Sequence, residues 1–142
     1  MNPSSNRKKI VPVVCAILRR ENRVLVAKRP MDKLLGGLWE FPGGKVEPDE
    51  TPEAALHREL MEELGCTLEI TSSLPDFPHE YDWCIVQLHP FCAHLRDDSP
   101  APHPIEHLEL RWVSAAELAA LTPEMAPADV PLLEHVEKLF RT

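Results

Sequence analysis

The sequence predicts an α/β fold in which helices pack on a mixed β sheet. Short apolar, β-branched runs alternate with segments of helical periodicity, which is the pattern of such folds. Proline and glycine clusters separate these runs and mark loops. The 142 residues are enough for one domain around one core. We expect this domain to span residues 10–142, after a disordered lead-in over residues 1–9.

The first third of the chain predicts short strands. Residues 10–18 are apolar and β-branched, which favours a buried strand. A polar turn follows, and residues 23–28 predict the returning strand of a hairpin. After a loop, residues 38–41 predict a short extended piece, and the run Pro42-Gly43-Gly44 is expected to interrupt regular structure.

A helix with clear ends is expected next. Thr51 is a good N-cap, because its side-chain oxygen can accept a hydrogen bond from the first turn, and Pro52 suits the first helical position. We expect the helix to run to Leu64 and Gly65 to end it in the left-handed conformation.

The rest of the chain predicts further strands and two more helices. Ser114, with Glu117 three residues later, has the capping-box pattern of a helix start. Apolar runs separated by proline-bearing loops favour strands. Strands are therefore expected over residues 67–70, 81–95 and 108–113, and helices after Ser114 and over residues 132–140.

The composition limits the partners and the location of the protein. A net charge of −8 argues against binding duplex nucleic acid through the overall field. No apolar run approaches a membrane span and no secretory segment follows the polar start, so we expect a cytoplasmic protein. The cysteines lack CxxC spacing and lie in apolar stretches, which predicts buried free thiols at Cys15, Cys66, Cys84 and Cys92.

Three glutamates share one face of the expected helix. Glu59, Glu62 and Glu63 have the spacing i, i+3, i+4. A solvated acidic face is one interpretation of this pattern. The preceding Gly43 and Gly44 favour another, because they allow the backbone to approach a ligand closely. Such oxygen donors suit Mg²⁺ or Mn²⁺ and leave positions for phosphate oxygens. The apolar residues expected to pack on the sheet are Leu56, Leu60, Met61 and Leu64.

The residues around this face resemble the Nudix box of a hydrolase superfamily. The run Gly44-x5-Glu50-x7-Arg58-Glu59-Leu60-x-Glu62-Glu63-x-Gly65-Cys66 matches every charged and glycine position, and only Cys66 departs, since it replaces an aliphatic residue. Residues 37–47 and 126–133 resemble the MutT-like and CTP-pyrophosphohydrolase-like branch. The resemblance covers the chain from about Val11 and implies an α/β/α sandwich around a mixed β sheet.

The resemblance also implies an activity that uses divalent metal. Members of this branch hydrolyse a nucleoside triphosphate to the monophosphate and pyrophosphate, with Mg²⁺ as the cofactor and Mn²⁺ as the alternative. By resemblance, the metal ligands are Glu59, Glu62, Glu63 and the carbonyl oxygen of Gly43.

Two more residues receive catalytic roles from the resemblance. Arg58 is expected to orient the glutamates rather than to touch the substrate. The base is Glu59 or a carboxylate outside the box, for which Glu106 is the candidate as base and further metal ligand, because it lies six residues before Trp112. An ordinary loop glutamate is the alternative role for Glu106.

Four residues are candidates for substrate binding. Lys28 and Arg29 end a strand just before the box; one of them should meet the phosphates, and Arg29 matches the family position better. Phe41 can stack on the base or belong to the core. The position of Asp129 reads the base edge in MutT-like enzymes, and an N-cap of the last helix is its alternative role.

The aspartate at position 129 bears on specificity. The best-known MutT sequences carry Asn there, which both donates and accepts, whereas an ionised Asp only accepts and a protonated one also donates. The departure argues against strict 8-oxo-dGTP specificity and favours a broader or cytosine-directed one. Other diphosphate-linked substrates and a non-catalytic nucleotide-binding module remain alternatives, and so do a monomer and a homodimer.

Overall fold

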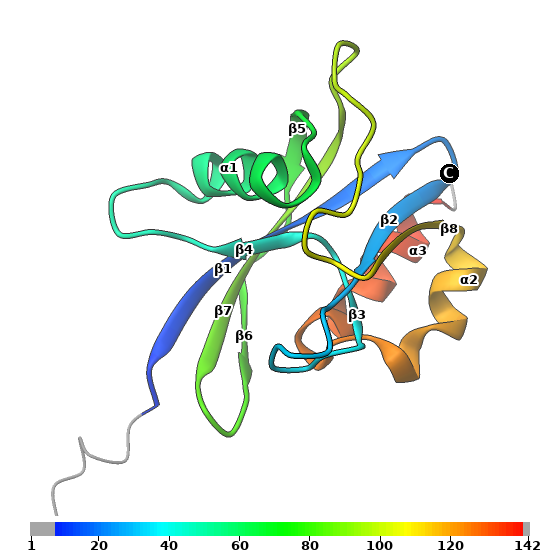
Figure 1. Ribbon diagram of the computed structural model, residues 1–142. Helices are drawn as coiled ribbons and strands as arrows, with labels where there is room; N and C mark the ends of the chain where they lie inside the picture. Colours follow the sequence, from blue (N-terminus) through cyan, green and yellow to red (C-terminus); the bar gives the residue numbers. More distant parts are fainter. Residues whose placement is uncertain (1–7, 141–142) are drawn as a thin grey trace, which may run out of the picture.

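Strands and helices alternate along residues 8–140, the part of the chain that this computed structural model describes (Figure 1). The strands are β1 (Ile10–Arg20), β2 (Arg23–Lys28), β3 (Trp39–Glu40), β4 (Gly43–Lys45), β5 (Leu68–Ser73), β6 (Phe77–Glu80), β7 (Ile85–Leu95) and β8 (Glu109–Val113). The helices are α1 (Pro52–Leu64), α2 (Ala115–Ala120) and α3 (Leu133–Leu139), with the 3-10 helices η2 (Thr122–Glu124) and η3 (Pro127–Leu132) before the last.

The sheet is mixed and is organised around β1. Its order is β3-β2-β1-β7-β5, while β4 pairs with β1, β6 with β7, and β8 with β2. β1 and β7 run parallel, in a register from Ile10 opposite Ile85 to Leu18 opposite Ala93. The other pairs of named strands are antiparallel. β1 therefore connects the half of the sheet that carries β4 to the half that carries β2.

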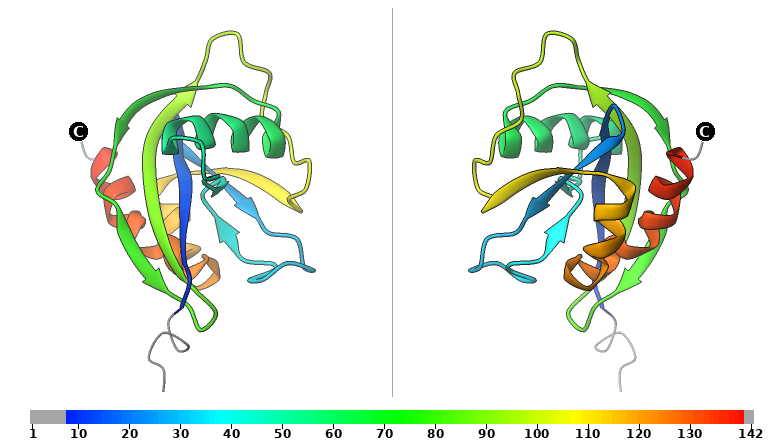
Figure 2. Two further views of the ribbon diagram at one scale, coloured as in Figure 1. Left: turned by 90° about the vertical axis from the view of Figure 1, so that its left-hand side faces the viewer. Right: turned by 90° about the vertical axis from the view of Figure 1, so that its right-hand side faces the viewer.

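Side chains of β1 alternate between two hydrophobic cores, as strand geometry requires. Cys15 and Ile17 enter one core, and Val14, Ala16 and Leu18 enter the other. α1 packs in the second core, whereas α2 and α3 pack in the first, so helices cover both faces of the sheet (Figure 2). The predicted α/β/α sandwich around a mixed sheet is confirmed.

The expectation that Pro42-Gly43-Gly44 interrupts regular structure is confirmed for Pro42, which lies between β3 and β4, and is wrong for the two glycines. Gly43 and Gly44 open β4, which pairs with β1 opposite Cys15 and Val14. A Cβ atom on Gly43 would lie 1.9 Å from the carbonyl oxygen of Val14, so only glycine allows this backbone approach. The same pairing places Gly43 and Gly44 on the sheet next to α1.

The long strand expected from residue 81 begins instead at Ile85, because residues 81–84 turn the chain between β6 and β7. The backbone N–H of Tyr81 donates to the carbonyl of Cys84 at 2.8 Å and closes this turn. β6, which was expected to be loop, pairs with β7 despite Pro78. Within the described residues β6 pairs with β7 alone, and proline is tolerated on such edge strands.

Residues 1–7 of the predicted lead-in lie outside the described residues, but Lys8 and Lys9 contact the β6–β7 hairpin. The Lys8 ammonium donates to Glu80 at 2.7 Å, and the carbonyl of Lys9 accepts from Ile85. All four cysteines are free thiols; Cys15, Cys66 and Cys92 are buried as predicted, whereas Cys84 is partly exposed. No helix in residues 8–140 has the length and apolar character needed to cross a bilayer.

Candidate active site

The ends of α1 form as the sequence predicts, and they determine which face of the helix meets β4. Thr51 accepts from the backbone N–H of Ala54 at 3.2 Å, and Gly65 ends the helix at φ 64°. The leucines at 56, 60 and 64 are fully buried against the sheet. Met61 was expected on that packed face but is 47% exposed, so the apolar stripe is narrower than predicted.

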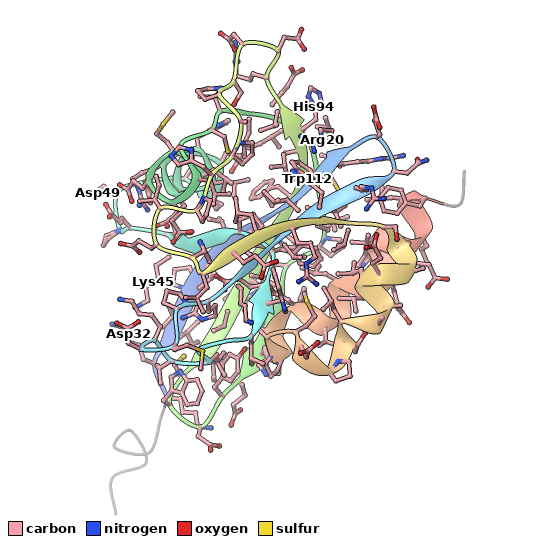
Figure 3. The ribbon with its side chains drawn as sticks, turned by 45° about the vertical axis from the view of Figure 1, so that its right-hand side comes forward. Arg20, Asp32, Lys45, Asp49, His94 and Trp112 are labelled. Carbon is pink, nitrogen blue, oxygen red and sulfur yellow. The ribbon has the colours of Figure 1, made fainter. Side chains whose placement is uncertain are left out.

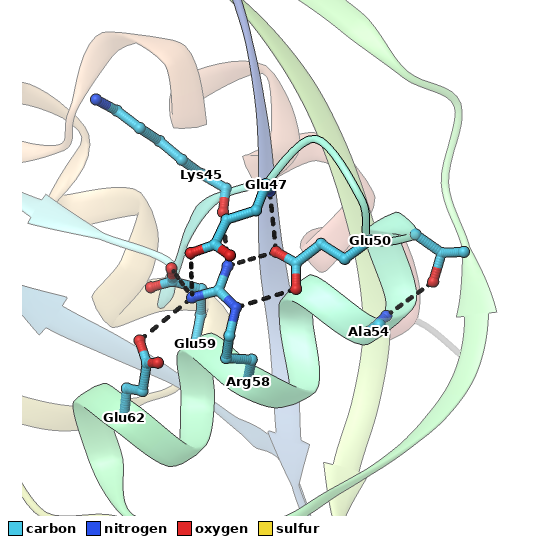
Figure 4. A network of polar contacts seen from close by, with 8 residues as sticks. Lys45, Glu47, Glu50, Ala54, Arg58, Glu59 and Glu62 are labelled. Carbon is cyan, nitrogen blue, oxygen red and sulfur yellow. Dashed lines mark hydrogen bonds and ion pairs between the residues drawn. The ribbon is translucent and has the colours of Figure 1, made fainter.

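Arg58 connects β4, the loop before α1 and the glutamate face of that helix (Figure 4). Its guanidinium donates to both carboxylate oxygens of Glu50, to Glu59 at 2.8 Å and to Glu62 at 3.2 Å. It also donates to the carbonyl oxygen of Lys45 at 3.0 Å. Glu50 in turn accepts from the backbone N–H of Glu47 at 2.9 Å. The arginine therefore holds the glutamates of α1 against β4.

Gly44 provides the surface on which Glu59 rests. A Cβ atom on Gly44 would lie 2.3 Å from Oε2 of Glu59, so a larger residue would displace that carboxylate. The Glu59 side chain is only 13% exposed in this position. Burial raises its pKa, which hydrogen bonds from Arg58 partly offset.

We expect the replacement of Gly44 by alanine to affect activity and the replacement of Gly43 by alanine to affect stability. Gly44→Ala should move the flexible Glu59 carboxylate and lower kcat at least about tenfold, with little loss of stability, since small misplacements of reacting groups are costly. Gly43→Ala should instead destabilise the fold by about 2 kcal/mol or more, because its Cβ meets backbone. Activity assays and urea unfolding of both variants check this. A Gly44→Ala enzyme with normal kcat would show that a side chain at position 44 does not displace the Glu59 carboxylate.

Glutamates and cations share a pocket of about 620 Å³ between α1, β4 and the segment before β8. We call it the carboxylate pocket. Glu106 lines it together with Glu59, Glu62 and Glu63, so the structure brings all four predicted carboxylates together. Glu63 is the most constrained of them: its Oε2 atom is buried and has no hydrogen-bond partner. Burial, with repulsion from Glu59 second, raises the pKa of Glu63 to about 8.

The donor chemistry of this pocket fits a divalent ion. A buried carboxylate oxygen without a partner is costly, and a hard cation is the partner that would satisfy it among further carboxylates. In residues 8–140 no three His, Cys, Asp or Glu side chains are placed to contact one ion together, because Glu59 and Glu62 face Arg58 instead. Glu62 is 60% exposed and free to change rotamer.

A second pocket, of about 560 Å³, adjoins the first, and we call it the apolar pocket. Phe41 and Asp129 line it, and both are buried. Asp129 accepts from the backbone N–H of Phe41 at 2.9 Å. Burial, with repulsion from Glu40 second, raises the pKa of Asp129 to about 8. The alternative role of Asp129 as a helix cap is wrong, since the residue at the α3 N-cap is Leu132 and no side chain caps it.

The two pockets meet at Arg29 and Glu40, which line both. The Arg29 guanidinium donates to Glu40 at 3.0 Å and to the carbonyl of Leu34 at 2.9 Å. His107, buried beside Glu106, lies with Nε2 3.0 Å from the other oxygen of Glu40. Lys28 lies outside both pockets, with its ammonium 5.9 Å from the centre of the Trp39 ring.

Sequence reasoning missed the other groups at this junction. Lys33 and Lys45 line both pockets as cations, and Lys45 projects on the same side of the molecule as Asp32 (Figure 3). Neither Glu40 nor His107 was assigned a role from the sequence. The signal available in the sequence was the position of Lys45 directly after Gly44.

The raised carboxyl pKa values predict how stability varies with pH. Glu63 and Asp129 both have pKa values of about 8 in the folded chain, above the ordinary value near 4 of an unfolded carboxyl. Their contribution to stability is therefore complete below about pH 4 and is lost as the pH rises to about 8. In EDTA, thermal unfolding should give a lower Tm near pH 8 than near pH 5.5. A double variant, Glu63→Gln with Asp129→Asn, should flatten this dependence, and a Tm that rises with pH would contradict it.

Comparison with known proteins agrees with this geometry. The NUDIX domain family model matches residues 8–136. The CTP pyrophosphohydrolase of Escherichia coli (strain K12) is 43% identical over 126 residues, which cover 89% of this chain and 90% of that protein. The 8-oxo-dGTP diphosphatase of the same organism is 30% identical over 132 residues, which cover 93% and 99%. The crystal structure of the MutT protein from Methanosarcina mazei Go1 has a TM-score of 0.79 at 26% identity and covers 96% of this chain and 99% of that one.

The family-model match spans both pockets, β4 and α1. The complete box of glutamates, its arginine and its glycines thus stand in the fold in which such a box occurs, and the chain belongs to the Nudix hydrolase family.

Proposed function

We propose that the protein is a Mg²⁺-dependent nucleoside triphosphate pyrophosphohydrolase that releases a nucleoside monophosphate and pyrophosphate. Its substrates are oxidised or otherwise modified (d)NTPs, of the 8-oxo-dGTP or the cytosine type. The observation that carries the proposal is that a carboxylate pocket and an apolar pocket meet at Arg29 and Glu40. The triphosphate of a nucleotide, with its metal ions, suits the carboxylate pocket, and the base suits the apolar pocket. The names of the two E. coli relatives agree with it.

The carboxylate pocket supplies the groups that hydrolysis needs. Divalent ions, when bound by Glu59, Glu62, Glu63, Glu106 and the Gly43 carbonyl, would neutralise phosphate charge and polarise the attacking water. Glu59 or Glu106 accepts the proton of that water, and burial makes Glu59 a stronger proton acceptor than an exposed glutamate. Arg58 positions Glu59 and Glu62.

The apolar pocket supplies the groups that recognise a base. Phe41 forms part of its wall, and its backbone N–H fixes one oxygen of Asp129. The raised pKa of Asp129, about 8, keeps the carboxyl protonated near neutral pH. A protonated carboxyl both donates and accepts, so it can pair with an oxidised purine as well as with cytosine. Arg29 lines both pockets, so it lies where the phosphates of a bound nucleotide would connect the base to the metal ions.

Product analysis tests the reaction, and Glu62→Gln tests the site. With Mg²⁺, a panel of 8-oxo-dGTP, dCTP, 5-substituted dCTP and 2-hydroxy-dATP should yield monophosphate and pyrophosphate. Release of orthophosphate and a nucleoside diphosphate would contradict the proposed products, and binding without turnover would favour a non-catalytic module.

Glu62→Gln should lower kcat about a hundredfold or more without loss of stability, since Glu62 is 60% exposed. The cytoplasmic location and the monomeric or homodimeric state stay predictions.

A further inference from the structure

An aromatic pair at the tip of the β6–β7 hairpin has no role in the activity described so far. Tyr81 and Trp83 stack with ring centroids 4.8 Å apart and planes inclined by 10°. Three hydrogen bonds fix Tyr81: its N–H donates to Cys84 O at 2.8 Å, its carbonyl accepts from Lys8 at 2.9 Å, and its hydroxyl accepts from Ala128 N–H at 3.0 Å. The stacked partner of Trp83 is therefore held firmly in place.

Trp83 lines the apolar pocket and is nevertheless 47% exposed. Leu34 lines the same pocket and is 63% exposed. Large apolar side chains that gather exposed at the mouth of a pocket mark a binding surface, since they gain by losing water when a ligand enters. Asp129 lines the same cavity and follows Ala128, the residue that binds Tyr81. The aromatic pair and the buried carboxyl thus belong to one wall of the pocket.

The occupant that fits this wall is a nucleobase. A base is flat and aromatic on its faces and polar on its edge, which matches an indole beside a carboxyl. The pocket of about 560 Å³ has the size of a small-ligand site. Arg29, Lys33 and Lys45 continue from it into the carboxylate pocket, where a triphosphate would lie.

We propose that Trp83, held against Tyr81, is a base-stacking residue of the substrate site. This inference rests on the proposed function and extends it. Every base has a π face, so stacking contributes affinity without selecting among bases. Trp83 therefore sets how tightly the nucleotide binds, while the polar edge of the pocket selects which base binds.

Kinetics of Trp83→Ala test the proposal. The variant should raise KM about tenfold for both dCTP and 8-oxo-dGTP, because stacking on one aromatic ring is worth roughly that factor. The ratio of KM values for the two substrates and kcat should each stay within about twofold. Trp83→Phe, which keeps a ring, should keep most of the affinity. Thermal unfolding confirms that the half-exposed position tolerates the change.

Fluorescence gives a readout that needs neither metal nor turnover. Titration with dCMP and with 8-oxo-dGMP should quench tryptophan emission in the natural chain, and Trp83→Phe should abolish most of the quench. Trp112→Phe is the matched control and should keep it, because Trp112 packs under Arg20 in the α1-side core, away from the apolar pocket (Figure 3).

The possible failures are distinguishable. Unchanged KM in Trp83→Ala, or a fall in kcat alone, overturns the role of Trp83 and leaves the proposed function standing. A KM change for only one of the two bases also overturns it, since stacking does not select. If the natural chain hydrolyses no triphosphate, the proposed function fails, and persistence or loss of the monophosphate quench in Trp83→Phe then decides the stacking role alone.

Discussion

Glu63→Gln should lower kcat about a thousandfold while it raises the Tm of the metal-free protein. The carboxylate oxygen that would hold a divalent ion is buried and unpartnered, and its burial raises the pKa of Glu63 to about 8. Near neutral pH the metal-free folded chain must therefore keep this carboxyl protonated, although the same group is ionised in the unfolded chain, and a neutral amide removes that cost. Loss of a metal ligand removes several kcal/mol of transition-state stabilisation, and about 4 kcal/mol is a thousandfold in rate.

Steady-state kinetics with Mg²⁺ and thermal unfolding in EDTA measure both effects on the same samples. Glu53→Gln is the matched control, since Glu53 is an exposed glutamate in the first turn of the same helix. That variant should leave kcat unchanged and should not raise Tm. A Glu63→Gln protein that keeps its turnover would remove Glu63 from the metal site, and one that loses both turnover and stability would point to misfolding instead.

Arg58→Met should destabilise the fold by more than the loss of a surface ion pair would, and should abolish most of the turnover. The Arg58 side chain is 25% exposed, and its guanidinium pairs with the carboxylates of Glu50 and Glu59, whose side chains are 16% and 13% exposed. Removing one member of such a network leaves the other charges unpaired, and this costs more where less solvent reaches them. Met keeps most of the aliphatic part of the Arg side chain, so the loss of stability measures the effect of removing the charged guanidinium. Urea unfolding at neutral pH and kcat measure the two effects.

The destabilisation by Arg58→Met should shrink near pH 4, where protonation of the carboxylates removes the unpaired charges. Arg96→Met is the control, because Arg96 and Asp98 pair at 3.5 Å with side chains 57% and 82% exposed. Exposed pairs of this kind contribute at most about 1 kcal/mol. Equal effects of the two variants would show that the Arg58 network contributes no more than a surface ion pair.

Local signals made much of this fold predictable. The limits of α1 follow from Thr51, Pro52 and Gly65, which act on their immediate neighbours, and the structure has the helix where they place it. Ser114 and Glu117 form the capping box of α2 as expected. The hairpin of β1 and β2 depends on apolar runs and a turn that are adjacent in sequence.

Features that depend on distant residues were not predictable in the same way. Gly43 and Gly44 look like a break until Val14 is placed beside them, and β6 looks like loop until β7 pairs with it. Trp83 lies far from Asp129 in the chain, so no spacing in the sequence indicates that the two residues line the same pocket. Glu106 became a candidate only because the resemblance supplied a spacing to Trp112.

The alternation of side chains along β1 has a consequence for the unfolding of the whole molecule. Because neighbouring residues of this strand belong to opposite cores, neither layer of helices can separate without exposing the strand that supports the other. The protein should melt in one cooperative transition, with equal calorimetric and van't Hoff enthalpies. An ion or nucleotide that binds beside α1 then stabilises α3 on the far face as well, because α3 opens together with the rest of the molecule.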